Sequence, residues 1–563
     1  MITMVERNTL ERLLTWTAVL TTLIVLPWSS FDPINVPKLA VIAVGGFMAS
    51  GLLVSNSEIL KAAKFRPLML VTGLFIVDLL VVLFFSGNNF YQGLFGTFGR
   101  ASGFVAYVSL TFLLIAAAIA SSSSLAKKLC LSLMAAGLAS SIYGLFQSFN
   151  LDVFKWVNQY SPVIGFLGNP NFQSSFVGFS GIAAFGFILA IEVKKSQRYA
   201  SLLYLMLAAY VIKETDSQQG FLVLFGGIAI VMLIWISKSK YKYLKYPSLI
   251  LGFIGVALVT LGSINKGPLA SLLYKLSVTY RGDYWHAGWK MTTEHPLLGV
   301  GLDSYGDWYR RTRTVAATLR RGPDVTSNAA HNVLLDLSSN GGFPLLVIYL
   351  AIVFMVIRAI VKILKRATIF DPAISGLIAV WFAYLAQSII SLNQLGLAVW
   401  GWIISGLIIG YEINSRDKET EKIAPAPNRK GRNAKEIASS KVSPKTYMAM
   451  ISGLVVGALL GLPPLMASSK YLTALKSGDV KKVEQAAYIW PVDPYRMGQV
   501  AISLANNKFQ DEALVILKDG TEKFPDEYQM WRLLSEIPNA TPEQVAEAKR
   551  QMKRLDPHNP DLK

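Results

Sequence analysis

A histidine followed by an asparagine stands where a polar segment meets a long apolar one, in the stretch SNAAHNVLLDLSSNGGFPLL (327–346). Histidine is scarce, with four in the chain, and His331 lies at the start of the apolar segment. An imidazole with an ordinary pKa of about 6.5 accepts a proton at neutral pH, so it suits a general base that deprotonates a hydroxyl group. Two interpretations stay open from these residues alone. His331 is such a base, or it hydrogen-bonds the first turn of a helix.

Basic residues gather just before this histidine, in the segment 265–331. Five of them fall close together: Arg310, Arg311, Arg313, Arg320 and Arg321. The planar guanidinium group matches the oxygens of a phosphate. The pattern therefore indicates an anionic, phosphate-bearing ligand at the membrane–water boundary, and contact with the headgroups of membrane lipids is the alternative.

Further motifs follow one another in a definite order. Arg281 and Trp285 stand in RGDYWHAGW, the turn PLLGVG (296–301) comes next, and His331-Asn332 follows. An earlier stretch, GFLGNPNFQSSF (165–176), precedes another apolar segment. This succession resembles the O-antigen ligase/polymerase superfamily, which includes bacterial glycan ligases, O-antigen polymerases and protein O-oligosaccharyltransferases. The resemblance covers about residues 10–413.

The resemblance implies a membrane glycosyltransferase of the GT-C type. Its donor is a glycan on undecaprenyl pyrophosphate, its acceptor is a lipid or a surface protein, and no metal or other cofactor is required. His331 matches the family's catalytic histidine, and Arg281 matches an arginine that engages the pyrophosphate. Supporting positions match at Asn332, Trp285, Asn169 and Asn171.

Two positions depart from the family pattern. Members often carry Ser-Arg at an external turn before the eighth span, where this chain reads TDSQQGF, with Gln218 or Gln219 in place of the arginine. Either Gln218 takes this place beside the pyrophosphate, or the role has moved to Arg310 or Arg313. A carboxylate common after the His-Asn pair is replaced by Ser339, and Asp336, one turn earlier, is the expected substitute.

Membrane helices must position these residues. The chain is 53% hydrophobic and only 16% charged, whereas soluble proteins usually carry about 25% charged residues. The apolar residues fall in runs long enough to cross a bilayer as helices, which predicts an all-α polytopic membrane protein with about 12–13 transmembrane helices. The predicted spans are 13–28, 36–54, 67–85, 104–120, 128–146, 172–192, 200–214, 220–237, 247–264, 341–358, 373–392, 397–413 and 446–467.

Lysine and arginine concentrate in alternate short loops, for example at Lys61 and Lys64 and again at Lys194 and Lys195. The positive-inside rule then places the N-terminus in the cytoplasm and the C-terminal domain outside the bacterial cytoplasmic membrane. Much of the net charge of +19 is thus a topology signal, and nucleic acid is not an expected partner. The single cysteine, Cys130, excludes an intrachain disulfide and a cysteine-based metal site.

The composition divides the chain into four parts. Residues 1–413 form the expected glycan ligase domain, with a large external loop at 265–340. Residues 414–445 are polar and rich in charge and proline, which predicts a flexible cytoplasmic linker, and 446–467 form the additional span. Residues 468–563 are soluble in character, with turn signals about 33 residues apart. This spacing favours a tetratricopeptide-like domain that binds a partner protein, and an ordinary small helical domain is the alternative.

The leading function is transfer of a glycan to a terminal acceptor. A polymerase of repeat units and a protein O-oligosaccharyltransferase use the same chemistry, and a solute transporter is the alternative from another class. A transporter should place ionisable groups near the membrane midplane. Asp78, inside the third predicted span, is the main residue of this kind, and hydrogen bonding between helices is its simpler explanation.

Overall fold

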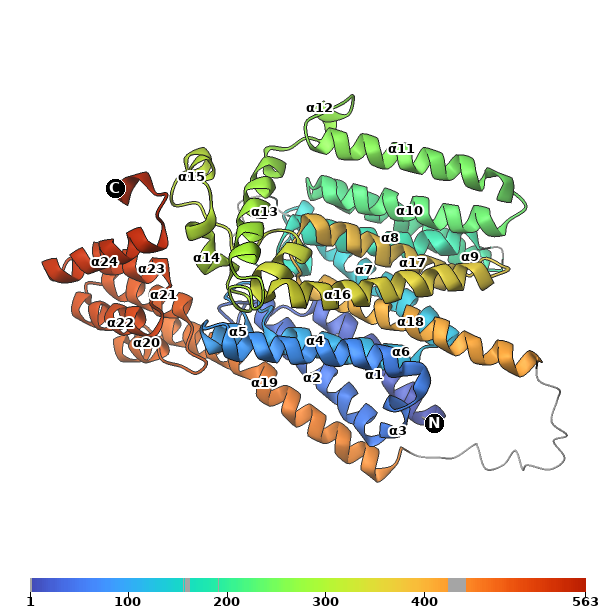
Figure 1. Cartoon of the computed structure of the whole chain (residues 1–563), viewed down its shortest axis with the longest axis horizontal. Helices are drawn as coiled ribbons and strands as arrows, with labels where there is room; N and C mark the ends of the chain where they lie inside the picture. Colours follow the sequence, from blue (N-terminus) through green and yellow to red (C-terminus); the bar gives the residue numbers. More distant parts are fainter. Residues whose placement is uncertain are drawn as a thin grey trace.

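A computed structural model describes residues 3–154, 156, 161, 163–190, 192–423 and 442–562. Figure 1 shows a bundle of long, roughly parallel and antiparallel helices with a group of shorter helices at one end. The described residues contain no β-strand. The all-α fold class predicted from the sequence is confirmed.

Each predicted span corresponds to one long helix. These helices are α1 (Met4–Leu23), α2 (Asn35–Ser55), α4 (Arg66–Phe85), α6 (Phe104–Ala120), α7 (Ser123–Ser148), α8 (Pro170–Leu189), α9 (Lys195–Glu214), α10 (Gln218–Lys238), α11 (Lys245–Ser263), α16 (Val333–Arg366), α17 (Pro372–Ile390), α18 (Leu395–Ile423) and α19 (Pro444–Ser477). Ten helices among the described residues are long and apolar enough to cross a membrane. Of the other three, α6 has 17 residues, and α1 and α9 carry charged residues in their end turns. The chain is a multi-pass membrane protein.

Glycines let two pairs of helices approach closely. On α19, Gly453, Gly457 and Gly461 recur every four residues and face α2, where an added Cβ on Gly457 would lie 2.7 Å from the Ala43 carbonyl oxygen. On α18, a Cβ on Gly406 would lie 2.0 Å from the carbonyl oxygen of Leu114 in α6. Small residues at such spacing are a usual means of packing helices in membranes. The stripe therefore fixes α19, and the domain that follows it, against the bundle.

Replacing Gly457 with leucine is expected to push α19 away from α2 and to destabilise the protein by about 1–3 kcal/mol, because the added side chain meets backbone that cannot move aside. The measurement is the melting temperature of the purified full-length protein. Gly252→Leu in α11 is the matched control, since a Cβ there meets nothing within 4 Å. An equal loss of stability in both variants would contradict the packing account.

A layer of short elements covers one end of the bundle. It contains α5 (Phe90–Phe95), α12 (Ala270–Leu273), α13 (Leu276–Glu294), α14 (Tyr305–Thr312) and α15 (Val315–Arg321). Its own apolar cluster includes Tyr284, Met291, Tyr305 and Tyr309. The N-terminus lies at the opposite end of the bundle (Figure 1). We call these elements the end layer.

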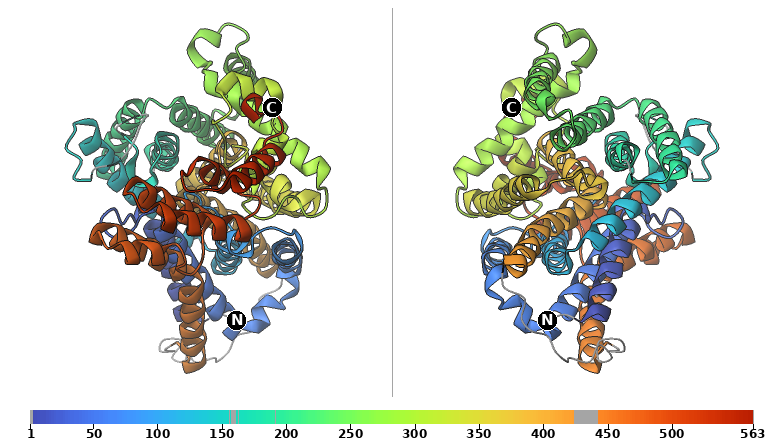
Figure 2. Two further views of the ribbon diagram at one scale, coloured as in Figure 1. Left: turned by 90° about the vertical axis from the view of Figure 1, so that its left-hand side faces the viewer. Right: turned by 90° about the vertical axis from the view of Figure 1, so that its right-hand side faces the viewer.

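The C-terminal domain lies across the same end as this layer, as Figure 2 shows. It comprises α20 (Val480–Ala486), α21 (Pro494–Asn506), α22 (Gln510–Lys523), α23 (Tyr528–Glu536) and α24 (Pro542–Leu555). Successive helices pack around one apolar core that includes Met497, Ile516 and Trp531. The assignment of these helices to tetratricopeptide-like repeats stays a prediction.

The first ten residues of the predicted linker at 414–445 belong to helix α18. Helix α18 continues to Ile423, so residues 414–423 are helical. The carboxylate of Glu412 stabilises this end of the helix, because it accepts hydrogen bonds from Arg416 one turn later. Residues 424–441 of the predicted linker lie outside the described residues, and α19 begins at Pro444.

Candidate active site at the end of the helix bundle

His331 is held between two anchors just before α16. The Asp336 carboxylate accepts a hydrogen bond from the Ala330 backbone nitrogen at 2.7 Å. On the other side, the Asn332 side chain caps the helix by accepting from the backbone nitrogens of Leu334 and Leu335. His331 itself has φ of +52°, a backbone conformation that is strained for a residue with a side chain. The anchors fix this conformation and with it the direction of the imidazole.

The His331 ring stacks on Tyr284 of α13. Their ring centroids are 5.3 Å apart and their planes are inclined by 27°. Arg321 lies against the same tyrosine and donates a hydrogen bond to its hydroxyl oxygen, and its guanidinium carbon is also 4.4 Å from the ring centroid of Tyr280. The Tyr305 hydroxyl donates to the Tyr284 carbonyl oxygen at 2.7 Å. Helix α15 and the segment before α16 thus bring an arginine and a histidine to one tyrosine of α13.

Burial and positive charge keep His331 neutral. Burial is the larger cause and the charges of Arg281, Arg100 and Arg321 are the next, and together they lower the pKa of His331 to about 4. Burial also lowers the pKa of Arg281. The neutral imidazole is a weaker base than an ordinary histidine, and the positive charges near it would attract an anion. An anionic ligand bound beside these arginines would raise the pKa of His331 and strengthen it as a base.

A buried arginine joins the end layer to the start of α16. Arg100, in the loop between α5 and α6, pairs with Asp303 at 3.2 Å and with Asp336 at 3.7 Å. Asp303 also accepts hydrogen bonds from the Thr97 backbone nitrogen and from the Ser102 hydroxyl. Asp336 contacts both the Ala330 backbone and Arg100. This position is compatible with Asp336 serving in place of the carboxylate that family members carry later in the sequence, where this chain has Ser339.

The PLLGVG turn closes a break in α16. The helix is interrupted at Gly342, where φ is +72°. The Phe343 nitrogen donates to the Pro296 carbonyl oxygen at 2.8 Å, and the Val300 nitrogen donates to the Ser339 carbonyl oxygen at 2.8 Å. A Cβ on Gly342 would lie 2.6 Å from the Pro296 carbonyl oxygen. The turn therefore satisfies backbone groups that the break exposes, and the first part of α16 stays with the end layer.

Arg310 and Arg313, which the sequence predicts to bind the donor pyrophosphate, lie in a contact with the C-terminal domain. Both pair with Asp556 of the C-terminal domain, at 3.0 and 2.6 Å, and both donate to the Pro323 carbonyl oxygen. Arg310 also lies over the ring of Tyr528, 4.0 Å from its centroid. These buried contacts join the loop to the C-terminal domain, and pyrophosphate binding by the two arginines stays a prediction.

Gln218, Asn169 and Asn171 lie at helix ends of the bundle. Asn169 caps α8 by accepting from the Asn171 nitrogen at 2.9 Å. The Asn171 side chain accepts from the Ser217 hydroxyl at 2.7 Å, which ties α8 to the turn before α10. Gln218 donates to the Leu272 carbonyl oxygen at 2.7 Å. No contact joins these three residues to His331 among the described residues, and their contacts are those of structural positions.

Two other residues identified from the sequence have a buried polar atom without a hydrogen-bond partner among the described residues. The indole nitrogen of Trp285 is buried and has no hydrogen-bond partner among the described residues. The same holds for one carboxylate oxygen of Asp78 in α4. Trp285 is the neighbour of Tyr284 on α13, so its indole is a free donor in the helix that supports the His331 ring.

Three residues of the site were not selected from the sequence: Arg100, Arg321 and Tyr284. Arg321 belongs to the arginine group before His331, and Tyr284 stands in the same motif as Arg281 and Trp285. Each therefore had a signal that did not distinguish it from its neighbours. Arg100 lies more than two hundred residues before His331 in the sequence. Its one signal is that it is an isolated cation in one of the loops that carry few basic residues.

Fold and site define a multi-pass, all-helical membrane protein with histidine and arginine side chains at one end of its bundle. Residues 202–350 match the family described as O-antigen ligase. The match contains Arg281, Trp285 and His331-Asn332, and it confirms the resemblance to the O-antigen ligase superfamily. Residues 202–350 of the 563-residue chain are therefore similar to O-antigen ligases. No curated protein matches the chain.

Removing the carboxylate of Asp556 is expected to loosen the loop between α14 and α15. Asp556→Ala leaves Arg310 and Arg313 with carbonyl partners only, so we expect a loss of about 1.5–3 kcal/mol, the usual size of a hydrogen bond to a charged group. Hydrogen–deuterium exchange over 305–325 should then be faster. Asp561→Ala, in the same domain and without an ion pair among the described residues, serves as the control. Unchanged exchange in Asp556→Ala would contradict the assignment of the two arginines to this contact.

Proposed function

We propose that this protein transfers a glycan from undecaprenyl pyrophosphate to a terminal acceptor, a lipid or a surface protein. The observation that carries the proposal is the His331 imidazole stacked on Tyr284, against which Arg321 also lies, just before a membrane helix. A lipid-linked donor keeps its tail in the bilayer and its pyrophosphate at the boundary. At this boundary lie both the arginines that would bind the pyrophosphate and the histidine that would deprotonate the acceptor.

In the proposed step, an acceptor hydroxyl attacks the anomeric carbon of the donor glycan. The new carbon–oxygen bond forms as the bond from that carbon to the pyrophosphate oxygen breaks, and the hydroxyl proton passes to the His331 imidazole. Undecaprenyl pyrophosphate leaves with the electron pair of the broken bond. A single in-line displacement inverts the anomeric configuration.

Arg281 and Arg321 are the proposed pyrophosphate ligands. Their positive charges would stabilise the negative charge that grows on the leaving group, so the mechanism uses arginines where other glycosyltransferases use a metal ion. Arg321 takes the place of Gln218, Arg310 and Arg313 in this proposal, because its charge acts on His331 and it lies against Tyr284, on which the His331 ring stacks. The unpartnered indole nitrogen of Trp285 is a further donor for a phosphate oxygen.

The proposed orientation follows from the lysine and arginine bias. The helices alternate so that the end layer and the C-terminal domain share one end of the bundle (Figure 1). We place this end on the outer face of the bacterial cytoplasmic membrane and the N-terminus in the cytoplasm. A C-terminal helical domain beside the site gives room for a partner or acceptor protein.

The test in cells is a surface-glycan analysis of a strain that lacks this protein, complemented with wild type, His331→Ala or Arg281→Ala. Lys290→Ala is the matched control, since this residue shares α13 with Arg281 and pairs with Glu294. Long chains left on undecaprenyl pyrophosphate in both site variants would mean a ligase. Single repeats on the normal acceptor would mean a polymerase. A wild-type profile in both variants would overturn the proposal and favour transport.

The pH profile gives a second test, because the base must be neutral to act. A pKa of about 4 for His331 means that protonation reduces activity only as the pH falls through this value. We expect kcat/KM, which reports the free enzyme, to remain level from about pH 8 down to about pH 5. An acid limb at about 6.5, the ordinary histidine value, would contradict the environment assigned to His331.

A further inference from the structure

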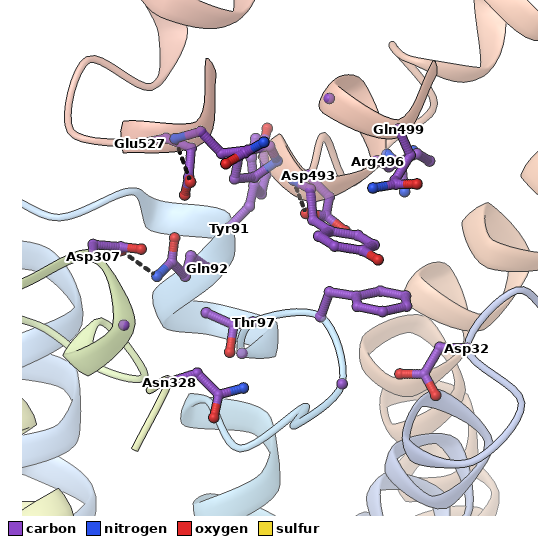
Figure 3. Close-up of a pocket in the computed structure, with 18 of the residues that line it drawn as sticks. Asp32, Tyr91, Gln92, Thr97, Asp307, Asn328, Asp493, Arg496, Gln499 and Glu527 are labelled. Atoms are coloured by element: carbon purple, nitrogen blue, oxygen red, sulfur yellow. Dashed lines mark hydrogen bonds between the residues drawn. The ribbon is translucent and has the colours of Figure 1, made fainter. Parts of the chain in front are cut away.

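A cavity of about 710 Å³ lies between the end layer and the C-terminal domain. Figure 3 shows side chains from separate parts of the chain around it. Asp32 comes from the loop after α1, Thr97 and Phe98 from the loop after α5, Asp307 from α14, and Asp493 and Glu527 from the C-terminal domain. Its volume lies in the range of small-molecule sites, about 300–1,000 Å³. His331 does not line it, so this cavity is separate from the site described above.

The polar lining includes four acidic side chains: Asp32, Asp307, Asp493 and Glu527. Burial raises the pKa of each of them. Arg496 donates to the carbonyl oxygens of Ala486, Ile489 and Pro491 and Arg310 pairs with Asp556, while the charge of Arg496 acts on Asp493 and that of Arg310 acts on Glu527. Neither arginine forms an ion pair with the four acids among the described residues, so their carboxyl groups can accept hydrogen bonds from a ligand.

Three of these acids also cap helices, and the caps account for one oxygen only. Asp32 Oδ1 accepts from the backbone nitrogens of Ile34 and Asn35, Asp493 Oδ1 accepts from the Tyr495 nitrogen, and Glu527 Oε1 accepts from the Gln529 nitrogen. Capping explains why acids stand at these positions. For Asp32 it leaves the Oδ2 atom unassigned.

Asp32 gives the clearest sign of a missing partner. The residue is 3% exposed, and its Oδ2 atom has no hydrogen-bond partner among the described residues, although the Gly99 backbone N–H acts on the carboxylate. Lys38 does not fill the gap, because its ammonium donates to the carbonyl oxygens of Thr21, Thr22 and Ile24. A buried acceptor without a donor is destabilising, and a ligand hydroxyl at Oδ2 would remove this penalty.

Aromatic rings supply the apolar part of the lining. Phe98 stacks on Tyr495 of the C-terminal domain with ring centroids 4.1 Å apart, and Phe31 packs against Tyr471 at 4.6 Å. Aromatic surface beside carboxylate and amide groups suits a sugar, which offers apolar C–H faces and many hydroxyl donors. A simple anion would instead be repelled by the acids.

The cavity and the His331 site share a wall. Asn328 lines the cavity and lies three residues before His331 in the sequence. Its carbonyl oxygen accepts a hydrogen bond from Arg100. Thr97 lines the cavity and donates to Asp303, the ion-pair partner of Arg100. The cavity therefore lies next to the residues that hold His331 in place.

We propose that this cavity binds sugar units of the transferred glycan, with saccharide hydroxyl groups donating to Asp32, Asp493 and Glu527. The identity of the saccharide as the transferred glycan rests on the proposed function. Binding itself is independent of transfer, since none of the cavity acids takes part in the bond changes at His331.

The test measures equilibrium binding to the purified full-length protein in lipid nanodiscs. The probe is the free oligosaccharide released by mild acid from the lipid-linked glycans of the source strain. Asp32→Asn and Glu527→Gln keep an oxygen for the helix cap but lose the carboxylate, and each is expected to raise the Kd at least tenfold. Gln499→Trp, which fills the cavity from α21, should abolish binding. Glu543→Gln, exposed and outside the cavity, should bind as wild type does.

His331→Ala separates the two proposals. If it binds the oligosaccharide as wild type does and no longer transfers glycan, both stand. If it still transfers glycan, the proposed function fails, and the cavity variants alone then decide the binding site. Wild-type affinity in Asp32→Asn, Glu527→Gln and Gln499→Trp would overturn the cavity proposal. So would binding of a lysine hexapeptide in place of the oligosaccharide, which would assign the acids to a basic partner.

Discussion

Replacing His331 with alanine is expected to lower the rate of glycan transfer by about 10²- to 10⁴-fold, the usual contribution of a positioned general base. The imidazole is the one group of the site that is neutral and able to take a proton, while Arg281 and Arg321 are cations. The variant keeps the Asp336 contact with Ala330 and the Asn332 cap, because both anchors use neighbouring atoms. The loss should therefore appear in kcat, with little change in donor binding.

The measurement is a single-turnover assay at saturating lipid-linked donor, with donor affinity measured separately. His286→Ala is the matched control, since His286 lies on α13 and is exposed. We expect it to act at the wild-type rate. A His331→Ala variant that kept wild-type kcat, or that lost activity only through weaker donor binding, would remove the base from the mechanism.

Replacing Arg100 with methionine is expected to destabilise the end layer by about 3–5 kcal/mol, the cost of leaving buried charges without their partner. Arg100 is 5% exposed and stands between Asp303 and Asp336, which are 2% exposed each. Without the guanidinium, two carboxylates remain buried at the start of α16. Because Asp336 also holds the Ala330 backbone, the direction of His331 should be lost together with the stability.

Two measurements check this result: thermal unfolding of the full-length protein, and hydrogen–deuterium exchange over 296–341. Arg320→Met is the control, since Arg320 forms an exposed pair with Asp283 and such pairs contribute little. Asp303→Asn combined with Arg100→Met should recover part of the loss, because it removes one of the two stranded charges. Equal stability of Arg100→Met and Arg320→Met would show that the buried cluster does not hold the layer.

The helices were predictable because the bilayer imposes a simple rule on composition. A helix that crosses the hydrocarbon core needs about 20 apolar residues. Each of the thirteen predicted spans therefore overlaps one helix of the structure. The break in α16 was harder to predict from the sequence. The predicted span began at 341, next to the interruption at Gly342, but hydropathy gave no sign that residues 333–341 are already helical and are held by the PLLGVG segment.

The candidate site was predictable where residue type and order carried the information. His331, Asn332, Arg281 and Trp285 stand in a recognisable succession, and α13 and α16 bring that succession to one end of the bundle. Sequence alone did not separate Arg321 from Arg310 and Arg313, because all have the same chemistry and lie in one loop. The difference is the contact with Asp556, more than two hundred residues later, which only the folded chain reveals.

The most direct test of the central claim is product analysis with the purified full-length protein in nanodiscs, given lipid-linked glycan and acceptor. We predict that wild type releases undecaprenyl pyrophosphate in step with glycosylation of the acceptor, with inversion at the anomeric carbon, and that His331→Ala releases none on the same timescale. Equal release by wild type and His331→Ala, or passage of a solute across proteoliposomes without any release, would contradict the account.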